Sequence, residues 1–439
     1  MVTVSYTHLD VYKRQEYNTG FIDNKAIIGI LRRAYNHVDK RLMDHGIRVA
    51  YIVSRMLRRM PQVSAAQTRD LCFLAAMHDV GAYKTEEIDQ MVRFETEEIW
   101  EHSVYGCLFI KNFTPLFELA QAILFHHAPW SELERMEDVS RENKHAAQLI
   151  HLADRLDIWL NAEGGSYADF ARIVRAERGQ RFEPFFVDLL LEQEFAPFTA
   201  EEVECDPAFQ QMQAEISFTG EEIRDYLKMV IYSIDFRSRH TVTHTMTTTS
   251  ISNELAEYME LGAQERNNVV CGALLHDLGK IGIPVEILEF PGKLSPQAMA
   301  VMRTHVDVTE EIFGGDIPSP IREIALRHHE KLDGSGYPRG LRAQQLSLEE
   351  RIVALADIVS ALAGTRSYKK AFGKERICAI ITGMREDGLM DPALVGCMLA
   401  HYDEIMEKTR VRCQPVLEIY QKLQADYNAI YAQYAPVRA

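Results

Sequence analysis

The sequence predicts an all-α protein of two tandem domains that arose by internal duplication. From about Phe21 onward, apolar residues recur at intervals of three and four, and few stretches alternate with the period of two that marks a strand. A length of 439 residues suits two to three domains. Histidines and aspartates also recur in the same order in both halves of the chain, which indicates a repeat.

The repeat covers five histidines and two aspartates. Each member of the first array has a counterpart between 198 and 203 residues later, and ten of the sixteen histidines belong to the two arrays. Independent structural histidines would not keep this order. The first array is His45, His78, Asp79, His102, His126, His127 and Asp154; the second is His244, His276, Asp277, His305, His328, His329 and Asp357.

These patterns divide the chain into four segments. Residues 1–20 are expected to be a disordered or non-native leader, because Met1–Gln15 shows no helical periodicity and no link to the helical region after it. Residues 21–200 form the first repeat and 236–439 the second. Between them, 201–235 is predicted as a connecting helix, with a capping-box signal at Thr219–Glu222.

Composition excludes several classes of function. With 48 basic and 64 acidic residues, the net charge of −16 disfavours general binding of DNA or RNA. No apolar run is long enough to span a bilayer, so membrane attachment is unsupported. The seven cysteines are scattered and form no C-x-x-C pair, which favours a reducing, cytoplasmic setting over a disulfide framework or a thiolate zinc site.

The adjacent pair His276 and Asp277 comes after an apolar run, and Lys280 stands three residues later. Neighbouring residues on a helix point about 100° apart, so both can face one site only at a buried junction. An imidazole beside a carboxylate suits a transition metal, and a carboxylate can bridge two ions. A helix end with a polar cap is the ordinary alternative. Five imidazoles and two carboxylates exceed one tetrahedral zinc and suit two ions such as iron or manganese.

The second repeat resembles the HD-GYP family of bacterial cyclic-dinucleotide phosphodiesterases, within the HD superfamily of metal-dependent phosphohydrolases. The resemblance spans about Arg237 to Tyr402. It rests on four motifs, of which the run H-H-E-x-x-D-G-S-G-Y-P is the most specific: His276–Pro284, Met302–His305, His328–Pro338 and Ala356–Asp357.

This resemblance implies roles for individual residues. The second array would hold the metals, with Asp277 as the bridging ligand, and Lys280 would assist at the scissile phosphate. Gly336, Tyr337 and Pro338 would shape a loop near the substrate. Arg366 and Lys369, in a segment similar to the family's R-x-Y-K, would grip phosphate; a solvated helix terminus is the alternative for this pair.

Two positions depart from the family pattern. Many members carry a second aspartate three residues after the last ligand, where this chain has Ser360. Members with a third metal use a glutamate four residues before the first histidine, where this chain has His240. His240 is therefore a candidate third-metal ligand, with a surface histidine as the equal alternative.

The first repeat keeps all seven ligand types but lacks other features. Ala82 stands in the position of Lys280, Ala128–Trp130 comes after the paired histidines in place of the G-Y-P loop, and no R-x-Y-K is present. This repeat is expected to retain a metal site without a phosphate grip. A degenerate, metal-free pseudo-enzyme is the alternative.

The resemblance implies a hydrolase that opens cyclic di-GMP to pGpG, with GMP as a further product, in bacterial second-messenger signalling. It would use two divalent ions, or three with His240, iron or manganese being expected. Three alternatives stay open: a phosphodiesterase for 3′,3′-cyclic GMP-AMP, another HD-type nucleotide phosphohydrolase, and a non-catalytic dinucleotide-sensing or docking protein. A homodimer and signalling-protein partners are also open.

Overall fold

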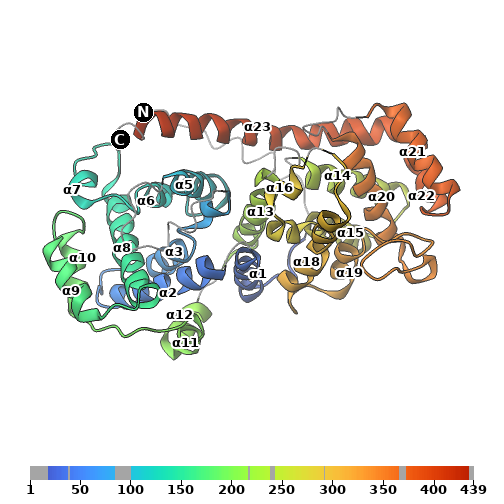
Figure 1. Ribbon diagram of the computed structural model, residues 1–439. Coiled ribbons are helices and arrows are strands. Elements are labelled where there is room, and N and C mark those ends of the chain that lie inside the picture. The colour runs from blue at the N-terminus through green and yellow to red at the C-terminus, as the bar shows by residue number, and fades with distance from the viewer. Residues whose placement is uncertain are drawn as a thin grey trace. The chain divides into compact units, whose positions relative to one another are not determined.

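The computed structural model describes residues 18–37, 40–84, 100–215, 218–237, 243–290, 292–364 and 372–434. Most of the predicted leader, residues 1–17, lies outside these ranges and stays a prediction. Within them the regular structure is helical, accompanied only by two isolated β-bridges, so the all-α prediction is confirmed. The chain divides into two compact units (Figure 1). The C-terminal unit consists of Met1–His37 and Val230–Leu423, and the N-terminal unit consists of Val38–Met229 and Gln424–Ala439.

In the N-terminal unit, six elements carry the first array. Helix α2 packs against α3 and α8, while α5 packs against η2 and α6. These elements are α2 (Lys40–Leu57), α3 (Ala65–Ala76), η2 (Val80–Lys84), α5 (Glu101–Phe113), α6 (Ala120–Leu124) and α8 (Arg141–Asp157). The unit also contains η3 (Phe117–Leu119), α7 (Trp130–Leu133), η4 (Ile158–Ala162), α9 (Tyr167–Ala176), α10 (Pro184–Leu191), α11 (Ala200–Cys205) and α12 (Pro207–Glu215).

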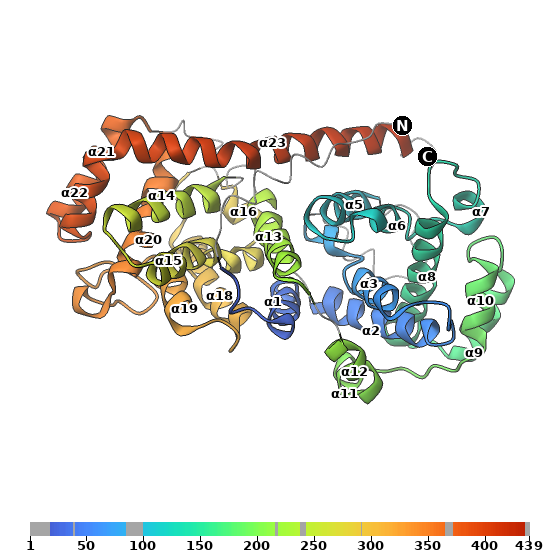
Figure 2. The same cartoon turned by 180° about the vertical axis from the view of Figure 1, so that it is seen from behind.

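The C-terminal unit repeats this order. Helix α14 packs against α15 and α20, and α18 packs against η5 and α19 (Figures 1 and 2). The repeated elements are α14 (His244–Tyr258), α15 (Ala263–Leu275), η5 (Leu278–Gly282), α18 (His305–Phe313), α19 (Ser319–Leu326) and α20 (Leu348–Ala363). The remaining ones are α16 (Val285–Leu288), α17 (Pro296–Arg303), η6 (Ala343–Gln345), α21 (Lys374–Glu386) and α22 (Pro392–Ala400).

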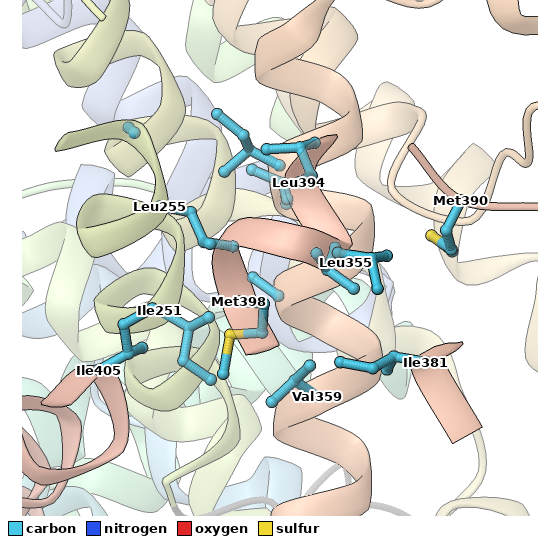
Figure 3. Close-up of a cluster of buried hydrophobic side chains, with 14 of the residues drawn as sticks. Ile251, Leu255, Leu355, Val359, Ile381, Met390, Leu394, Met398 and Ile405 are labelled. Atoms are coloured by element: carbon cyan, nitrogen blue, oxygen red, sulfur yellow. The ribbon is translucent and has the colours of Figure 1, made fainter. Parts of the chain in front are cut away.

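An apolar core fixes the ligand-bearing helices of the C-terminal unit. Ile251 and Leu255 of α14 meet Leu355 and Val359 of α20, with Met398 of α22 beside them (Figure 3). All five side chains are at most 1% exposed. Burying each contributes roughly 1.5–3 kcal/mol of hydrophobic free energy, so this packing fixes α14, which carries His244, against α20, which carries Asp357.

Local capping explains where key helices begin. Helix α20 starts with a capping box, in which Glu350 N donates to Ser347 Oγ at 3.3 Å and Ser347 N donates to the Glu350 carboxylate at 3.1 Å. The capping box predicted at Thr219 is present as well, with Glu222 N donating to Thr219 Oγ1 at 3.2 Å. It opens helix α13 (Gly220–Arg237). Residues 201–235 therefore hold α11 and α12 in addition to the expected helix.

The first helix packs with the C-terminal unit, whereas the sequence pattern groups it with the first repeat. Helix α1 (Asn24–Asn36) contacts α18 and η5. Its Arg33 donates to the carbonyl oxygens of Ile312 at 2.7 Å and Phe313 at 3.1 Å, where α18 ends. Carbonyls in the last turn of a helix lack intrahelical donors, and here a side chain distant in the sequence donates to two of them.

The residues of the last helix are divided between the two units. Helix α23 (Tyr402–Tyr434) belongs to the C-terminal unit up to Leu423 and to the N-terminal unit from Gln424. Within the N-terminal unit, Tyr427 stacks on Tyr105 of α5 with ring centroids 4.7 Å apart. Across the described ranges, every helix is too short or too polar to cross a membrane.

Candidate metal centres

In both repeats the His-Asp pair lies where an α-helix changes into a 3-10 turn. His276 caps the C-terminus of α15, and Asp277 precedes η5. The turn then runs directly against α18, since a Cβ on Gly279 would lie 1.9 Å from the carbonyl oxygen of His305. A glycine is required for this approach, and it brings the pair close to His305. Gly81 has the same relation to His102, at 2.0 Å.

The seven residues of the second array form one cluster in the C-terminal unit. His244 Nε2 lies 3.2 Å from Asp277 Oδ2 and 3.1 Å from Asp357 Oδ1. His276 Nε2 lies 3.0 Å from Asp277 Oδ2. The donor atoms of His305, His328 and His329 form a second group, within 4.8 Å of one another. Asp277 lies between the groups, with Oδ1 at 3.7 Å from His305 Nε2.

Backbone carbonyls orient three of the imidazoles. Nδ1 of His276, His305 and His328 lies 2.6 Å from the carbonyl oxygen of the residue three positions earlier. Because a carbonyl only accepts, Nδ1 carries the hydrogen and Nε2 keeps its lone pair for the cluster. This is how proteins commonly orient histidine ligands of a metal ion.

Buried polar atoms without partners test whether the cluster fits a metal. Nε2 of His244, Nε2 of His276 and Oδ1 of Asp277 are buried and have no hydrogen-bond partner among the described residues. Leaving such atoms unsatisfied costs about 1–3 kcal/mol each, so native structures rarely contain three together. A divalent cation would satisfy all of them, and the residues therefore fit the group that the motifs imply.

Electrostatics keep the cluster in its ligand-competent form. Burial alone would raise the pKa of Asp277, but His276 and Lys280 outweigh it and hold the pKa well below its usual range. Burial lowers the pKa of His329 to about 3, so its imidazole is neutral. His244 is the exception: burial lowers its pKa, but the negative carboxylates of Asp277 and Asp357, 3.2 and 3.1 Å from Nε2, outweigh this and raise it to about 9.

Ser360, where the family pattern has an aspartate, contacts His244 directly. Its Oγ lies 3.0 Å from His244 Nδ1 and donates to the His244 carbonyl oxygen at 3.2 Å. The hydroxyl can thus accept the Nδ1 hydrogen and leave Nε2 of His244 facing the cluster. Ser360 therefore orients the His244 imidazole without adding a negative charge.

The G-Y-P loop lies against the cluster. Buried Glu330 accepts from the backbone of Arg339 at 2.7 Å and of Leu341 at 2.9 Å, which closes the loop. The Tyr337 ring then packs on His329 with centroids 4.5 Å apart. The guanidinium of Arg303 lies 4.7 Å from the Tyr337 centroid. The side chains of Arg303, His329, Glu330 and Tyr337 line a cleft of about 250 Å³.

The structure describes only one of the predicted residues outside the seven-residue array that were assigned to phosphate or a third metal. Lys280 Nζ lies 2.5 Å from Asp277 Oδ2, so the predicted lysine is at the cluster. His240, Arg366 and Lys369 lie outside the described residues, and their roles stay predictions. The structure adds Arg303 to the cleft; its place immediately before the Thr304–His305 pair was the sequence signal for it.

The first array forms a second cluster, in the N-terminal unit. His45 Nε2 lies 3.0 Å from Asp154 Oδ1, and His78 Nε2 lies 3.2 Å from Asp79 Oδ2. Nε2 of His102 and of His126 each lie 3.7 Å from Asp79 Oδ1. Four donors lie within 4.8 Å of one another: Asp79, His102, His126 and His127.

Charged residues that the motifs do not include surround this N-terminal cluster. Asp157 Oδ2 accepts from His45 Nδ1 at 2.6 Å, and Arg48 donates to Asp157 at 2.7 and 2.9 Å. Arg155 donates to Asp154 Oδ2 from Nη2 at 2.7 Å and from Nε at 3.0 Å. Asp157 was not among the predicted site residues, although it stands at the position of Ser360, where the family pattern has its second aspartate; no motif includes Arg155.

Two models of the HD domain match the chain, at residues 42–159 and 228–394. Among curated proteins, the chain is 29% identical to 3′3′-cGAMP-specific phosphodiesterase 1 of Vibrio cholerae over 82% of this chain and 88% of that protein. It is 36% identical to the cyclic di-GMP phosphodiesterase response regulator RpfG of Xanthomonas campestris, over 43% of this chain and 51% of that protein.

Among solved structures, the chain is similar to V-cGAP3, described as a cyclic GMP-AMP-specific phosphodiesterase of V. cholerae. The TM-score is 0.51 at 19% identity, over 87% of this chain and 98% of that one, which supports the shared fold. The two matched HD domains coincide with the two clusters, one in each compact unit. The chain therefore belongs to the HD domain family, with two HD domains in tandem.

Proposed function

We propose that this chain is a metal-dependent phosphodiesterase that hydrolyses a cyclic dinucleotide at the C-terminal cluster. The observation that carries the proposal is the convergence of three features: seven metal-ligand side chains, Lys280 at the shared carboxylate, and the G-Y-P loop against His329. The relatives named above, which act on cyclic GMP-AMP or cyclic di-GMP, support the same substrate class.

The metal ligands in this proposal are the seven residues of the second array, with Asp277 shared by two ions. A set rich in imidazole, with two carboxylates, suits iron or manganese better than magnesium. Bound metal would supply water activation and neutralise charge on the phosphodiester. His240 would add a third site.

The protein's own residues then position the substrate. Lys280 is 18% exposed in its side chain and stands at the shared carboxylate, so it can reach a non-reacting phosphate oxygen. Arg303 and Tyr337 line the cleft, where the guanidinium and the ring can hold the phosphate and a base. Arg366 and Lys369 are proposed as further phosphate contacts. Such preorganised charges stabilise the transition state without a covalent intermediate.

The choice of base is a separate question. Cyclic di-GMP, opened to pGpG, is the substrate that the G-Y-P motifs favour, whereas the relative that spans most of this chain is named for 3′3′-cGAMP. Measuring kcat/KM of the purified chain on both compounds decides between them. Turnover of neither, with metal bound and the fold intact, would overturn the proposal.

We further propose that the N-terminal cluster retains metal without catalysing this reaction. It has seven ligand-type residues and unpartnered buried atoms, but Ala82 replaces the lysine and no G-Y-P loop comes after His127. Without a phosphate clamp, a diester would not be positioned for attack, and positioning is a large part of such catalysis.

A further inference from the structure

Arg155 is an unusual residue to find at a metal-type cluster. It is 1% exposed and is the largest fully buried side chain among the described residues. Two of its nitrogens donate to the same oxygen, Asp154 Oδ2. The corresponding position in the C-terminal unit is Ile358, which packs on the apolar core. A guanidinium remains charged at any ordinary pH, so this half of the N-terminal cluster contains a permanent buried cation.

The residues around Arg155 are joined by ion pairs and hydrogen bonds. His45 lies between two carboxylates, 3.0 Å from Asp154 and 2.6 Å from Asp157. Asp157 is also held by Arg48 and by Asn161 Nδ2, the latter at 2.7 Å. Both carboxylates therefore already have cationic and N–H partners. An additional divalent ion in this half would have to be placed beside Arg155 in a region of low dielectric, where like charges repel strongly.

The other half of the cluster has the opposite character. His126 Nδ1 lies 2.6 Å from the carbonyl oxygen of Ile123, which leaves Nε2 facing inward. That Nε2, His127 Nε2 and Asp79 Oδ1 are buried and have no hydrogen-bond partner among the described residues. Three imidazoles and one carboxylate within 4.8 Å of one another form a complete set for one transition metal.

We propose that the N-terminal cluster binds one metal ion, through Asp79, His102, His126 and His127, and that Arg155 takes the electrostatic place of a second ion. This inference rests on the proposal that the N-terminal cluster retains metal, and it specifies how many ions bind and where. In the C-terminal unit the comparable cation is Lys280, whose side chain is 18% exposed and can turn toward substrate. Arg155 has no such freedom, so the cation is fixed.

The test counts metal in variants of the full-length chain. Each protein is loaded with Mn²⁺, desalted and analysed by elemental mass spectrometry. The metal content per chain of the parent is then subtracted from that of each variant, so that ions bound to the C-terminal cluster cancel. His126→Ala is expected to lose one equivalent per chain, and His45→Ala to lose none. Arg155→Ile, which copies the C-terminal residue, is expected to gain one. His145→Ala, a change at a one-third-exposed histidine of the same unit, is the control and should match the parent.

Loss of an equivalent in His45→Ala, or of two in His126→Ala, would overturn the inference. If Arg155→Ile does not fold, the pair His45→Ala and His126→Ala still decides the question. Thermal unfolding with and without Mn²⁺ supplies an independent readout, because stabilisation by the N-terminal ion should vanish in His126→Ala alone. Turnover measured on the same samples separates this result from failure of the proposed C-terminal activity.

Discussion

The two clusters place their cations on opposite carboxylates. In the C-terminal unit, Lys280 approaches Asp277, the carboxylate shared by both ligand groups. In the N-terminal unit, Arg155 binds Asp154. The shared carboxylate there is Asp79, and Ala82 occupies the position that corresponds to Lys280. One cation is partly exposed, while the other is buried and fixed. The two repeats therefore share one set of histidines and aspartates but differ in which carboxylate has a cationic partner.

The residues behind the first histidine differ in a parallel way. His244 is oriented by the neutral hydroxyl of Ser360, whereas His45 is oriented by Asp157, itself paired with Arg48. The last carboxylate of the array is also more accessible in the C-terminal unit: Asp357 is 10% exposed and Asp154 is 1% exposed. Access for substrate is thus greater where the proposed chemistry occurs.

The largest expected effect comes from the shared carboxylate. Asp277→Ala should abolish phosphodiesterase activity and reduce bound metal, because both ligand groups lose their common oxygen donor. Steady-state kinetics, elemental analysis and circular dichroism on one preparation check this. A folded Asp277→Ala protein that turns over near the parental rate would contradict the metal mechanism.

Removing the partly exposed cation should have a smaller effect. Lys280→Ala is expected to lower kcat by about 10²–10³, equivalent to about 2.7–4 kcal/mol, with metal content unchanged. The lysine would then act on the transition state and not on the ions. If metal is lost together with activity, Lys280 instead supports the cluster, and the contrast with Arg155 would disappear.

The pH dependence of metal binding should also distinguish His244 from the other ligands. Its pKa is raised to about 9 in the metal-free protein, so a proton must leave before Nε2 can bind an ion. The affinity for metal should therefore rise by up to about tenfold per pH unit between pH 7 and pH 9, and it should level off above pH 9. Isothermal titration of the metal-free chain measures this. A flat profile in this range would contradict the raised pKa of His244.

The same raised pKa determines how folding stability depends on pH. His244 favours the folded, metal-free state fully below its unfolded pKa near 6.5, and this contribution is lost as pH rises through about 9. The metal-free protein should lose part of its thermal stability over that interval. Addition of metal should reverse the trend. His244→Gln is the matched variant, and its thermal stability without metal should change little over the same pH interval.

Changing the residue behind His244 should have a modest effect. Ser360→Ala removes the hydrogen bond to Nδ1 and is expected to weaken metal binding by roughly tenfold, the low end for such partners. Ser360→Thr, which keeps the hydroxyl, is the control. Equal affinities in all three proteins would show that the ligand is oriented by packing alone.

The sequence predicted the all-α fold because the helical period is continuous, and it predicted both clusters because each ligand recurs in the same order. It could not predict that α1 packs with the C-terminal unit. That contact depends on Arg33 meeting carbonyl oxygens of Ile312 and Phe313, about 280 residues away, and no local pattern encodes it. Propensity and spacing describe neighbours along the chain, whereas this docking depends on distant backbone groups.

Arg155 illustrates the same limit within the site. From the sequence alone, an arginine next to Asp154 on a helix would be expected to be exposed to solvent, because arginine is rarely buried. Only the packed structure shows that the guanidinium is enclosed and directed at Asp154. Asp157 was accessible from the family pattern, because it occupies the second-aspartate position that Ser360 fills in the other repeat.

The most direct test of the division of labour compares matched double substitutions on the same cyclic dinucleotide. His78→Ala with Asp79→Ala removes the His-Asp pair of the N-terminal cluster, and His276→Ala with Asp277→Ala removes that of the C-terminal cluster. With saturating substrate and both proteins folded, the first variant is expected to keep kcat within a few-fold of the parent and the second to lose it. Equal loss of turnover in the two variants would show that the N-terminal cluster is catalytic or essential to the other, and would contradict this account.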